Sequence, residues 1–110
     1  MTDKERAYGM IGLAARAGKA VSGSDSVIGA IRSGNVRLLI ITKYISQNSL
    51  DKILRNITGT DEIPCYSFGS SDELGDALGK PARAGAAITD KSFADGISAI
   101  IEKISEEDNN

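Results

Sequence analysis

The side chains that could perform chemistry in this chain are few, and their types argue against catalysis. The sequence has no histidine and a single cysteine, Cys65. Histidine is the commonest general base and metal ligand, so neither a Cys–His pair nor a zinc cluster can be assembled from these residues. Cys65 falls in a segment of strand character, where we expect an inert core residue. The sequence therefore predicts a protein that is not an enzyme and holds no metal or cofactor.

Two glycine-containing segments superficially resemble phosphate-binding loops. In GLAARAGKA, five residues separate Gly12 from Gly18 instead of four, and Ala20 stands where serine or threonine would bind magnesium. The segment GDALGKP is too short and ends in Pro81. A phosphate-binding loop needs backbone amides curled around the phosphate and a hydroxyl residue after the lysine, so neither segment qualifies. A small-ligand α/β domain is therefore the weakest of the functional hypotheses.

Charged residues are unevenly distributed along the chain, although the formal net charge is only −2. Residues 1–43 carry seven Lys/Arg and three Asp/Glu, whereas residues 44–110 carry six and twelve. Such an asymmetry can mark a surface that faces nucleic acid. It can equally be a chance excess, so charge alone leaves both interpretations open.

Length and composition indicate one globular domain in a reducing compartment. The 110 residues are 41% hydrophobic and 25% charged, which suffices for a hydrophobic core. No apolar run approaches the roughly 20 residues of a membrane span, and the N-terminal residues lack the apolar segment of a signal peptide. A lone cysteine forms no disulfide within the chain. We therefore expect a cytoplasmic protein with no membrane partner.

Helical and strand patterns alternate along the chain with short connections. Apolar residues at helical spacing predict helices over residues 4–18, 24–34, 49–57, 70–79 and 91–104. Short extended or apolar segments predict strands over residues 19–23, 36–42, 63–68 and 85–89. Such alternation is typical of the α/β class, with helices on both faces of a sheet. We predict a three-layer α/β/α sandwich with a small mixed β-sheet of about four strands, formed by a single domain at residues 1–104 and followed by a polar, frayed tail at residues 105–110.

The helix predicted at residues 24–34 has an unusually bare exposed face. Its buried side is expected to hold Val27, Ile28 and Ile31. The residues left for its exposed side are small or charged: Asp25, Ser26, Gly29, Arg32 and Ser33. Because a glycine inside a helix costs about 1 kcal/mol relative to alanine, helix stability does not explain this face.

The order of several short motifs resembles the L7Ae/L30e superfamily of ribosomal proteins, which bind kink-turn RNA. The motifs are LAARAGKAVSG at the end of the first helix, RSG at 32–34, the buried strand at 37–42, ELG at 73–75 and the small-residue strand at 84–88. Together they span about residues 4–104. The chain is most similar to the small bacterial L7Ae-like, ribosome-associated proteins, and the family fold agrees with the sandwich inferred from the pattern.

In this superfamily a Gly-x-Asn-Glu-x-x-Lys signature opens the second helix and reads guanine edges at a sharp RNA bend. Aligned here, the glycine is Gly23, while Asp25, Ser26 and Gly29 replace the asparagine, glutamate and lysine. Asp25 keeps acceptors but loses the amide donor, and Gly29 has no side chain to donate. The resemblance therefore implies RNA binding without catalysis, with a kink-turn signature so eroded that phosphate and shape contacts dominate.

A second family loop matches residues 79–86, where Lys80 and Arg83 supply charge and Ala84 permits close approach. Lys43 follows the buried strand on what is expected to be the same rim. Six cations are expected to converge there as a phosphate-contacting patch, although singly each could be a solvated charge: Lys19, Arg32, Arg37, Lys43, Lys80 and Arg83. The RNA-binding residues predicted in this way are Gly23, Ser24, Asp25, Ser26, Gly29, Arg32, Lys43, Lys80, Arg83 and Ala84.

The resemblance implies a structured RNA as the partner, either ribosomal RNA or a kink-turn-like element, and association with the ribosome, without binding to DNA. The alternative is a protein–protein interaction module on the same fold that has lost selective RNA binding. In that case a partner would use the small surface around Gly29, because a Ser/Gly face lets another backbone approach closely. A plain helix-start role for Asp25 and a surface-filler role for Ser26 and Gly29 also remain open.

Overall fold

Helices and strands alternate along the chain in the computed structural model, which describes residues 1–57 and 63–108 and, for residues 105–108, the backbone alone. The helices are α1 (Asp3–Arg16), α2 (Ser24–Arg32), α3 (Gln47–Ile57), α4 (Ser71–Leu78) and α5 (Lys91–Asp108). The strands are β1 (Ala20–Ser22), β2 (Leu38–Ile41), β3 (Cys65–Ser67) and β4 (Gly85–Ile88). This order confirms the alternation predicted from the sequence.

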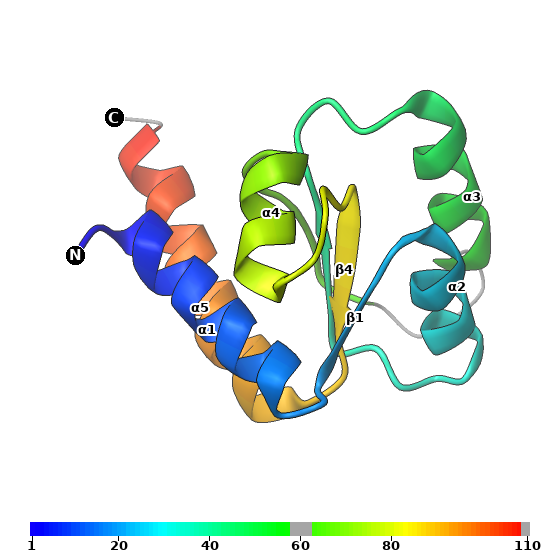
Figure 1. Ribbon diagram of the computed structural model, residues 1–110, viewed down its shortest axis with the longest axis horizontal. Helices are drawn as coiled ribbons and strands as arrows, with labels where there is room; N and C mark the ends of the chain where they lie inside the picture. Colours follow the sequence, from blue (N-terminus) through cyan, green and yellow to red (C-terminus); the bar gives the residue numbers. More distant parts are fainter. Residues whose placement is uncertain (58–62, 109–110) are drawn as a thin grey trace.

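The strands of the described residues form one mixed sheet in the order β1-β4-β2-β3. β4 runs antiparallel to both β1 and β2, whereas β3 runs parallel to β2. Helices α1, α4 and α5 cover one face of the sheet, and α2 and α3 cover the other (Figure 1). The structure therefore confirms the three-layer sandwich around a four-stranded mixed sheet.

Strand β2 divides the hydrophobic core between the two faces of the sheet. Leu38 and Ile40 pack in the cluster with α1, α4 and α5, while Leu39 and Ile41 pack in the cluster with α2 and α3. All four side chains are buried, as expected for a strand covered on both faces, because successive side chains of a strand point to opposite sides. The turn that follows β2 therefore starts at a fixed place on the edge of the sheet.

Helix α4, which leads into the loop before β4, is anchored at both ends. Ser70 and Glu73 cap it reciprocally, each side chain accepting from the other's backbone N–H at 3.2 Å. The Glu73 carboxylate also accepts from the Tyr8 hydroxyl at 3.2 Å and lies 2.7 Å from the Lys4 ammonium, which lowers the pKa of Glu73. Gly79 ends the helix with a φ of 71°, as the sequence predicts.

Two expectations about burial are wrong. Cys65 is exposed and not a core residue, because β3 is a three-residue edge strand whose first and last positions face outward. Ile28 is half-buried, because it lines a groove between α2 and α3 instead of packing inside the core.

The C-terminal helix is longer than the sequence predicts. Helix α5 continues to Asp108, past the predicted domain end at residue 104. That domain boundary stays a prediction, and residues 109–110 of the predicted tail lie outside the described residues. No helix in the described part of the chain combines the length and the apolar character needed to cross a membrane.

Candidate nucleic-acid interface

Three segments that are far apart in the sequence meet at one edge of the sheet. Strands β1 and β2 end there and β4 begins there, because β4 is antiparallel to both. The Gly23 N–H donates to the Gly85 carbonyl over 3.4 Å, and Thr42 donates to the Ala84 carbonyl through its N–H at 2.9 Å and its Oγ1 at 2.8 Å. We call this surface the rim, which consists of the start of α2 (23–26), the turn after β2 (42–44) and the loop before β4 (79–84).

Helix α2 begins at the rim without a side-chain cap. Its N-cap is Gly23, whose φ of 87° and ψ of 145° define a conformation that residues with a Cβ rarely adopt. The first amides of a helix lack partners inside it, and no side chain at the N-cap accepts from them here. Together with the helix dipole, the N–H groups of Ser24, Asp25 and Ser26 suit a phosphate. The exposed Asp25 carboxylate opposes this by placing a negative charge at the same helix end.

Three cations lie on the rim. Arg83 is half-buried and donates from Nε to the Ser22 Oγ at 3.2 Å, which holds its guanidinium at the end of β1. Lys80 is exposed and lines a hollow that Ser22 also lines. Lys43 is exposed, and its backbone N–H donates to the Gly69 carbonyl at 2.9 Å. The rim therefore brings together Lys43, Lys80, Arg83 and Ala84 with the start of α2.

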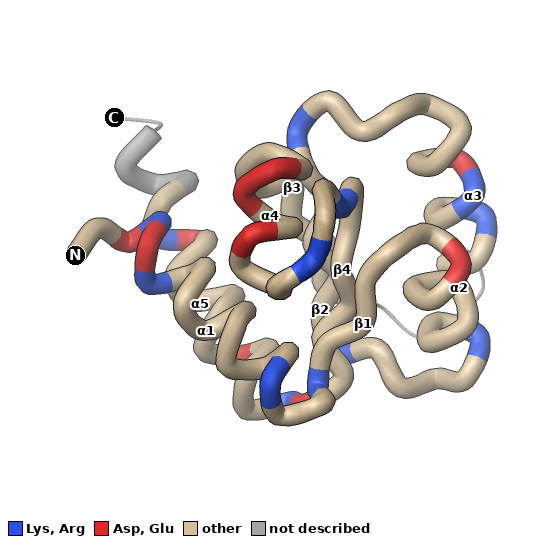
Figure 2. Tube along the Cα trace, viewed as in Figure 1, with Lys and Arg blue, Asp and Glu red and all other residues tan. Residues whose placement is uncertain are grey.

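The other three cations of the predicted patch do not lie there, so the expected convergence of six is wrong. Lys19 and Arg37 lie at the opposite edge of the sheet, where the Lys19 carbonyl accepts from Thr89 at 2.9 Å and the Arg37 N–H donates to Ile88 at 2.8 Å. Arg32 is the last residue of α2, about 10 Å along the helix axis from Asp25. Figure 2 shows Lys and Arg distributed over several elements, including the connection between α4 and β4 and part of α3.

The bare face of α2 is as exposed as the sequence predicts. All five of its residues are exposed: Asp25, Ser26, Gly29, Arg32 and Ser33. A Cβ added to Gly29 would meet no atom within 4 Å, so no packing inside the described residues requires glycine there. The small residues therefore leave open space beside this face of α2, and the face forms one wall of a groove.

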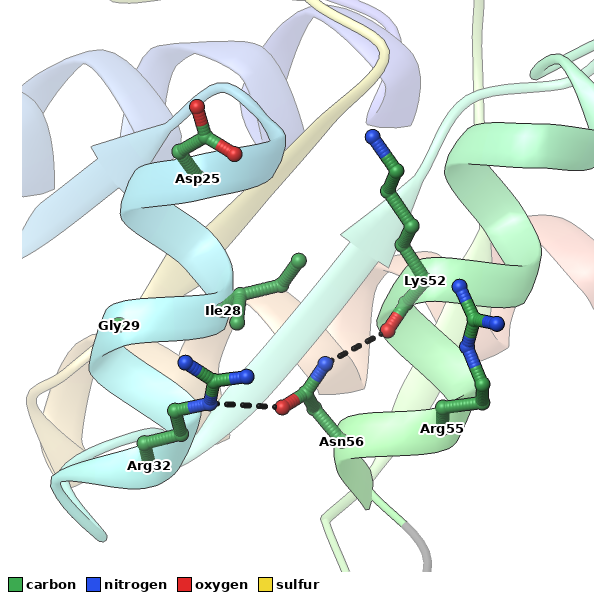
Figure 3. Close-up of a pocket in the computed structure, with 7 residues that line it drawn as sticks. All are labelled: Asp25, Ile28, Gly29, Arg32, Lys52, Arg55 and Asn56. Atoms are coloured by element: carbon green, nitrogen blue, oxygen red, sulfur yellow. Dashed lines mark hydrogen bonds between the residues drawn. The ribbon is translucent and has the colours of Figure 1, made fainter.

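The groove lies between α2 and α3, with a volume of about 600 Å³ (Figure 3). Arg32 donates from Nε to Asn56 Oδ1 at 2.9 Å, and Asn56 donates in turn to the Lys52 carbonyl at 2.8 Å. Lys52 and Arg55 also line the groove. Among the described residues, no carboxylate lies within ion-pair distance of these three cations.

Lys52 and Arg55 were not among the residues predicted from the sequence. They stand three positions apart on α3, a spacing that places them on neighbouring turns of one helix face. Nothing in the sequence pairs that face with α2, because the pairing depends on the packing of the two helices on the sheet.

Gly75 lets the rim loop lie against α4, and its replacement should disturb both. A Cβ at Gly75 would come within 2.4 Å of the Pro81 carbonyl oxygen and 2.9 Å of the Ala82 Cα, both backbone atoms that cannot move aside alone. Gly75→Ala is therefore expected to destabilise the protein by about 1–3 kcal/mol. Urea denaturation would measure the change in the free energy of unfolding.

A matched control for this variant exists in α1. Gly9→Ala also replaces a helical glycine, but a Cβ there meets nothing within 4 Å. It should stabilise the protein by about 0.5–1 kcal/mol through helix propensity. Equal effects of the two substitutions would contradict the close approach of the rim loop to α4.

Comparison with known proteins identifies the family of this chain. Residues 5–97 match the family described as ribosomal protein L7Ae/L30e/S12e/Gadd45. The chain belongs to this family. The RNA-binding protein YlxQ of Bacillus subtilis (strain 168) is 34% identical over 95 residues, covering 86% of this chain and 94% of that protein. The RNA-binding protein YlxQ of Enterococcus faecium is 30% identical over 100 residues, covering 91% and 95%.

A solved structure of a Bacillus halodurans protein of unknown function supports the same fold. It has a TM-score of 0.79 and 29% identity, covering 87% of this chain and 96% of that one. Membership in the L7Ae/L30e family confirms the resemblance seen in the sequence motifs. The chain is accordingly a ribosomal-protein-type domain and not an enzyme, and both YlxQ relatives are named as RNA-binding proteins.

Proposed function

We propose that this protein binds a structured RNA, either ribosomal RNA or a kink-turn-like element, and that it does so in association with the ribosome in the cytoplasm. The observation that carries the proposal is the convergence, on one rim, of the uncapped start of α2 with Lys43, Lys80 and Arg83. Free amides and cations at one edge suit the phosphates of a folded RNA.

The rim supplies phosphate and shape contacts more than base recognition. The guanidinium of Arg83, held by Ser22, can take a phosphate in two-point contact, and Ala84 leaves room for the RNA backbone. At the base-reading positions, Asp25 offers only acceptors, Ser26 a short hydroxyl and Gly29 nothing. Binding is therefore expected to respond to the bent shape of an RNA with little reading of its guanine edges.

The groove between α2 and α3 extends the same surface along α2. Asp25 lines one end of the groove and belongs to the rim, while Arg32 lines the other end (Figure 3). A strand of RNA that leaves the rim would meet Arg32, Lys52 and Arg55 in the groove, where Gly29 adds no side chain.

Equilibrium titration against a kink-turn RNA and a straight duplex of equal length tests the proposal. We expect binding to the kink-turn RNA at low salt, with an affinity that falls steeply as salt is raised, because phosphate contacts release counterions. The preference for the bend over the duplex should be modest, on the order of tenfold, because the base-reading side chains are missing. Absence of binding to either RNA at low salt would refute the proposal.

The alternative function is a protein–protein interaction module that uses the bare face of α2. The open space around Gly29 is the observation that favours it. Affinity purification with and without ribonuclease separates the two functions, because RNA-mediated partners such as the ribosome should be lost on digestion. Crosslinking followed by RNA sequencing would then identify the RNA. Partners that persist unchanged after ribonuclease treatment would favour the alternative.

A further inference from the structure

Tyr44 is the most anomalous side chain on the rim. The residue is 100% exposed, and its φ of 65° lies in the left-handed region. No other described residue except glycine has a positive φ. Glycine, asparagine and aspartate are the usual occupants of this conformation, whereas a bulky residue is strained in it. Tyr44 thus strains the backbone without burying its ring.

The turn around Tyr44 is fixed on both sides, so the strain is maintained by the fold. Before it, the backbone N–H of Lys43 donates to Gly69 at 2.9 Å. After it, Ile45 packs against the core cluster of α2 and α3, and the Ser46 Oγ accepts from the Ser49 N–H at 3.2 Å at the start of α3. The conformation at position 44 is therefore imposed, whichever residue stands there.

The other two tyrosines have structural roles that Tyr44 lacks. The Tyr8 hydroxyl donates to Glu73 at 3.2 Å, and its ring centroid lies 5.0 Å from that of Phe68. The Tyr66 hydroxyl donates to Glu102. With its side chain fully exposed, Tyr44 packs against none of the described residues. A ring that is fully exposed at a strained position gives the folded protein no evident benefit, so its benefit should lie in binding.

We propose that Tyr44 is a stacking platform for an unpaired base of the bound RNA. The inference rests on the proposed function and adds the feature of the RNA that this site recognises. An aromatic face stacks on any base, and single-stranded loops and bulges supply the splayed bases that proteins bind in this way. Lys43, directly before Tyr44, is placed to contact the phosphate beside that base. An RNA occupant is favoured over a protein because Lys80, Arg83 and the amides of α2 share the same rim.

Stacking would also compensate for the eroded signature. The positions that read guanine edges in the family hold Asp25, Ser26 and Gly29 here. Stacking on Tyr44 requires no hydrogen-bond donor or acceptor from those positions, and any of the four bases can stack in this way. The rim would then recognise a bent RNA with an extruded nucleotide, whatever the identity of its paired bases.

The test compares Tyr44→Phe and Tyr44→Asn with the unmodified protein by fluorescence-anisotropy titration of a labelled kink-turn RNA. Tyr44→Phe keeps the aromatic face and should bind like the unmodified protein. Tyr44→Asn should bind roughly 5- to 100-fold more weakly. Its salt dependence should be unchanged, because stacking releases no counterions. The thermal midpoint of the free Tyr44→Asn protein should be equal or higher, because asparagine tolerates the left-handed conformation.

A second RNA, with abasic sites in place of the unpaired loop nucleotides, completes a double-mutant cycle. Tyr44→Asn should lose little further affinity on this RNA, because the stacked base is already absent. Equal binding of Tyr44→Asn and the unmodified protein to the intact RNA would overturn the inference and leave the proposed function standing. A loss of affinity in Tyr44→Phe as large as in Tyr44→Asn would overturn it as well. Absence of binding by the unmodified protein at low salt would overturn the proposed function and the inference together.

Discussion

Replacing Lys43, Lys80 and Arg83 together by glutamine is expected to weaken RNA binding roughly 100-fold at about 0.1 M salt. Each phosphate contact contributes somewhat less than one unit to the slope of log affinity against log salt concentration, so the slope should fall by about two to three units. The three side chains lie on the rim, two of them exposed, so the free energy of unfolding should change little. Titrations at four or five salt concentrations would measure affinity and slope together.

A matched control removes the same charge at the opposite edge of the sheet. Lys19 and Arg37 lie there, next to Thr89 and Ile88, and Lys91 begins α5 three positions after the end of β4. All three are exposed. Glutamine at these positions changes the net charge equally but should alter the slope by less than about one unit, because no phosphate contact is lost. If both triple variants weakened binding alike, the RNA would be attracted by the overall charge of the protein, and the rim would have no special role.

Restoring the family's side chains should convert shape recognition into base recognition. The double variant Ser26→Glu with Gly29→Lys supplies an acceptor and a donor for guanine edges on the exposed face of α2. Each such contact is worth about 1–3 kcal/mol, so affinity for a kink-turn RNA should rise at least tenfold, whereas affinity for a straight duplex should change little. The measurement is the ratio of the two dissociation constants at one salt concentration.

The control for this gain is Ser26→Ala with Gly29→Ala. Both double variants improve helix propensity, and a Cβ at Gly29 meets no atom within 4 Å, so both should stabilise α2. Only the Glu/Lys pair carries the groups that read guanine. An unchanged kink-turn preference in the Glu/Lys variant would mean that this face of α2 does not meet RNA as it does in the family. An equal gain in the alanine control would assign the effect to helix stability.

The sequence predicts the layers of this fold well, because the spacing of apolar residues indicates which faces of each element are buried. The apolar run at Leu38–Ile41 indicates a strand covered on both faces, and the structure shows it between β4 and β3. The helix predicted over residues 70–79 agrees with α4, whose caps are Ser70 and Gly79. The burial of Cys65 was predicted wrongly because it depends on strand order. The residues of a three-residue strand do not indicate that the strand lies at the edge of the sheet.

Two of the predicted cations lie away from the rim for a topological reason. Lys19 and Arg37 precede their strands, whereas Gly23 and Thr42 follow theirs, so the sheet carries the two pairs to opposite edges. A cation's place relative to the strand ends therefore decides whether it reaches the rim. The groove residues on α3 escaped prediction because helix pairing across the sheet is set by tertiary packing.

The most direct test of the RNA interface is amide chemical-shift mapping of the ¹⁵N-labelled protein on addition of a kink-turn RNA. The account predicts the largest shifts at Ser24–Ser26, at Lys43 and Tyr44, and in the loop at 79–84, with smaller shifts on the groove faces of α2 and α3. The amides of Lys19, Arg37 and Thr89 at the opposite edge should stay unchanged. Largest shifts at that opposite edge, or on α1 and α5, would contradict the assignment of RNA binding to the rim.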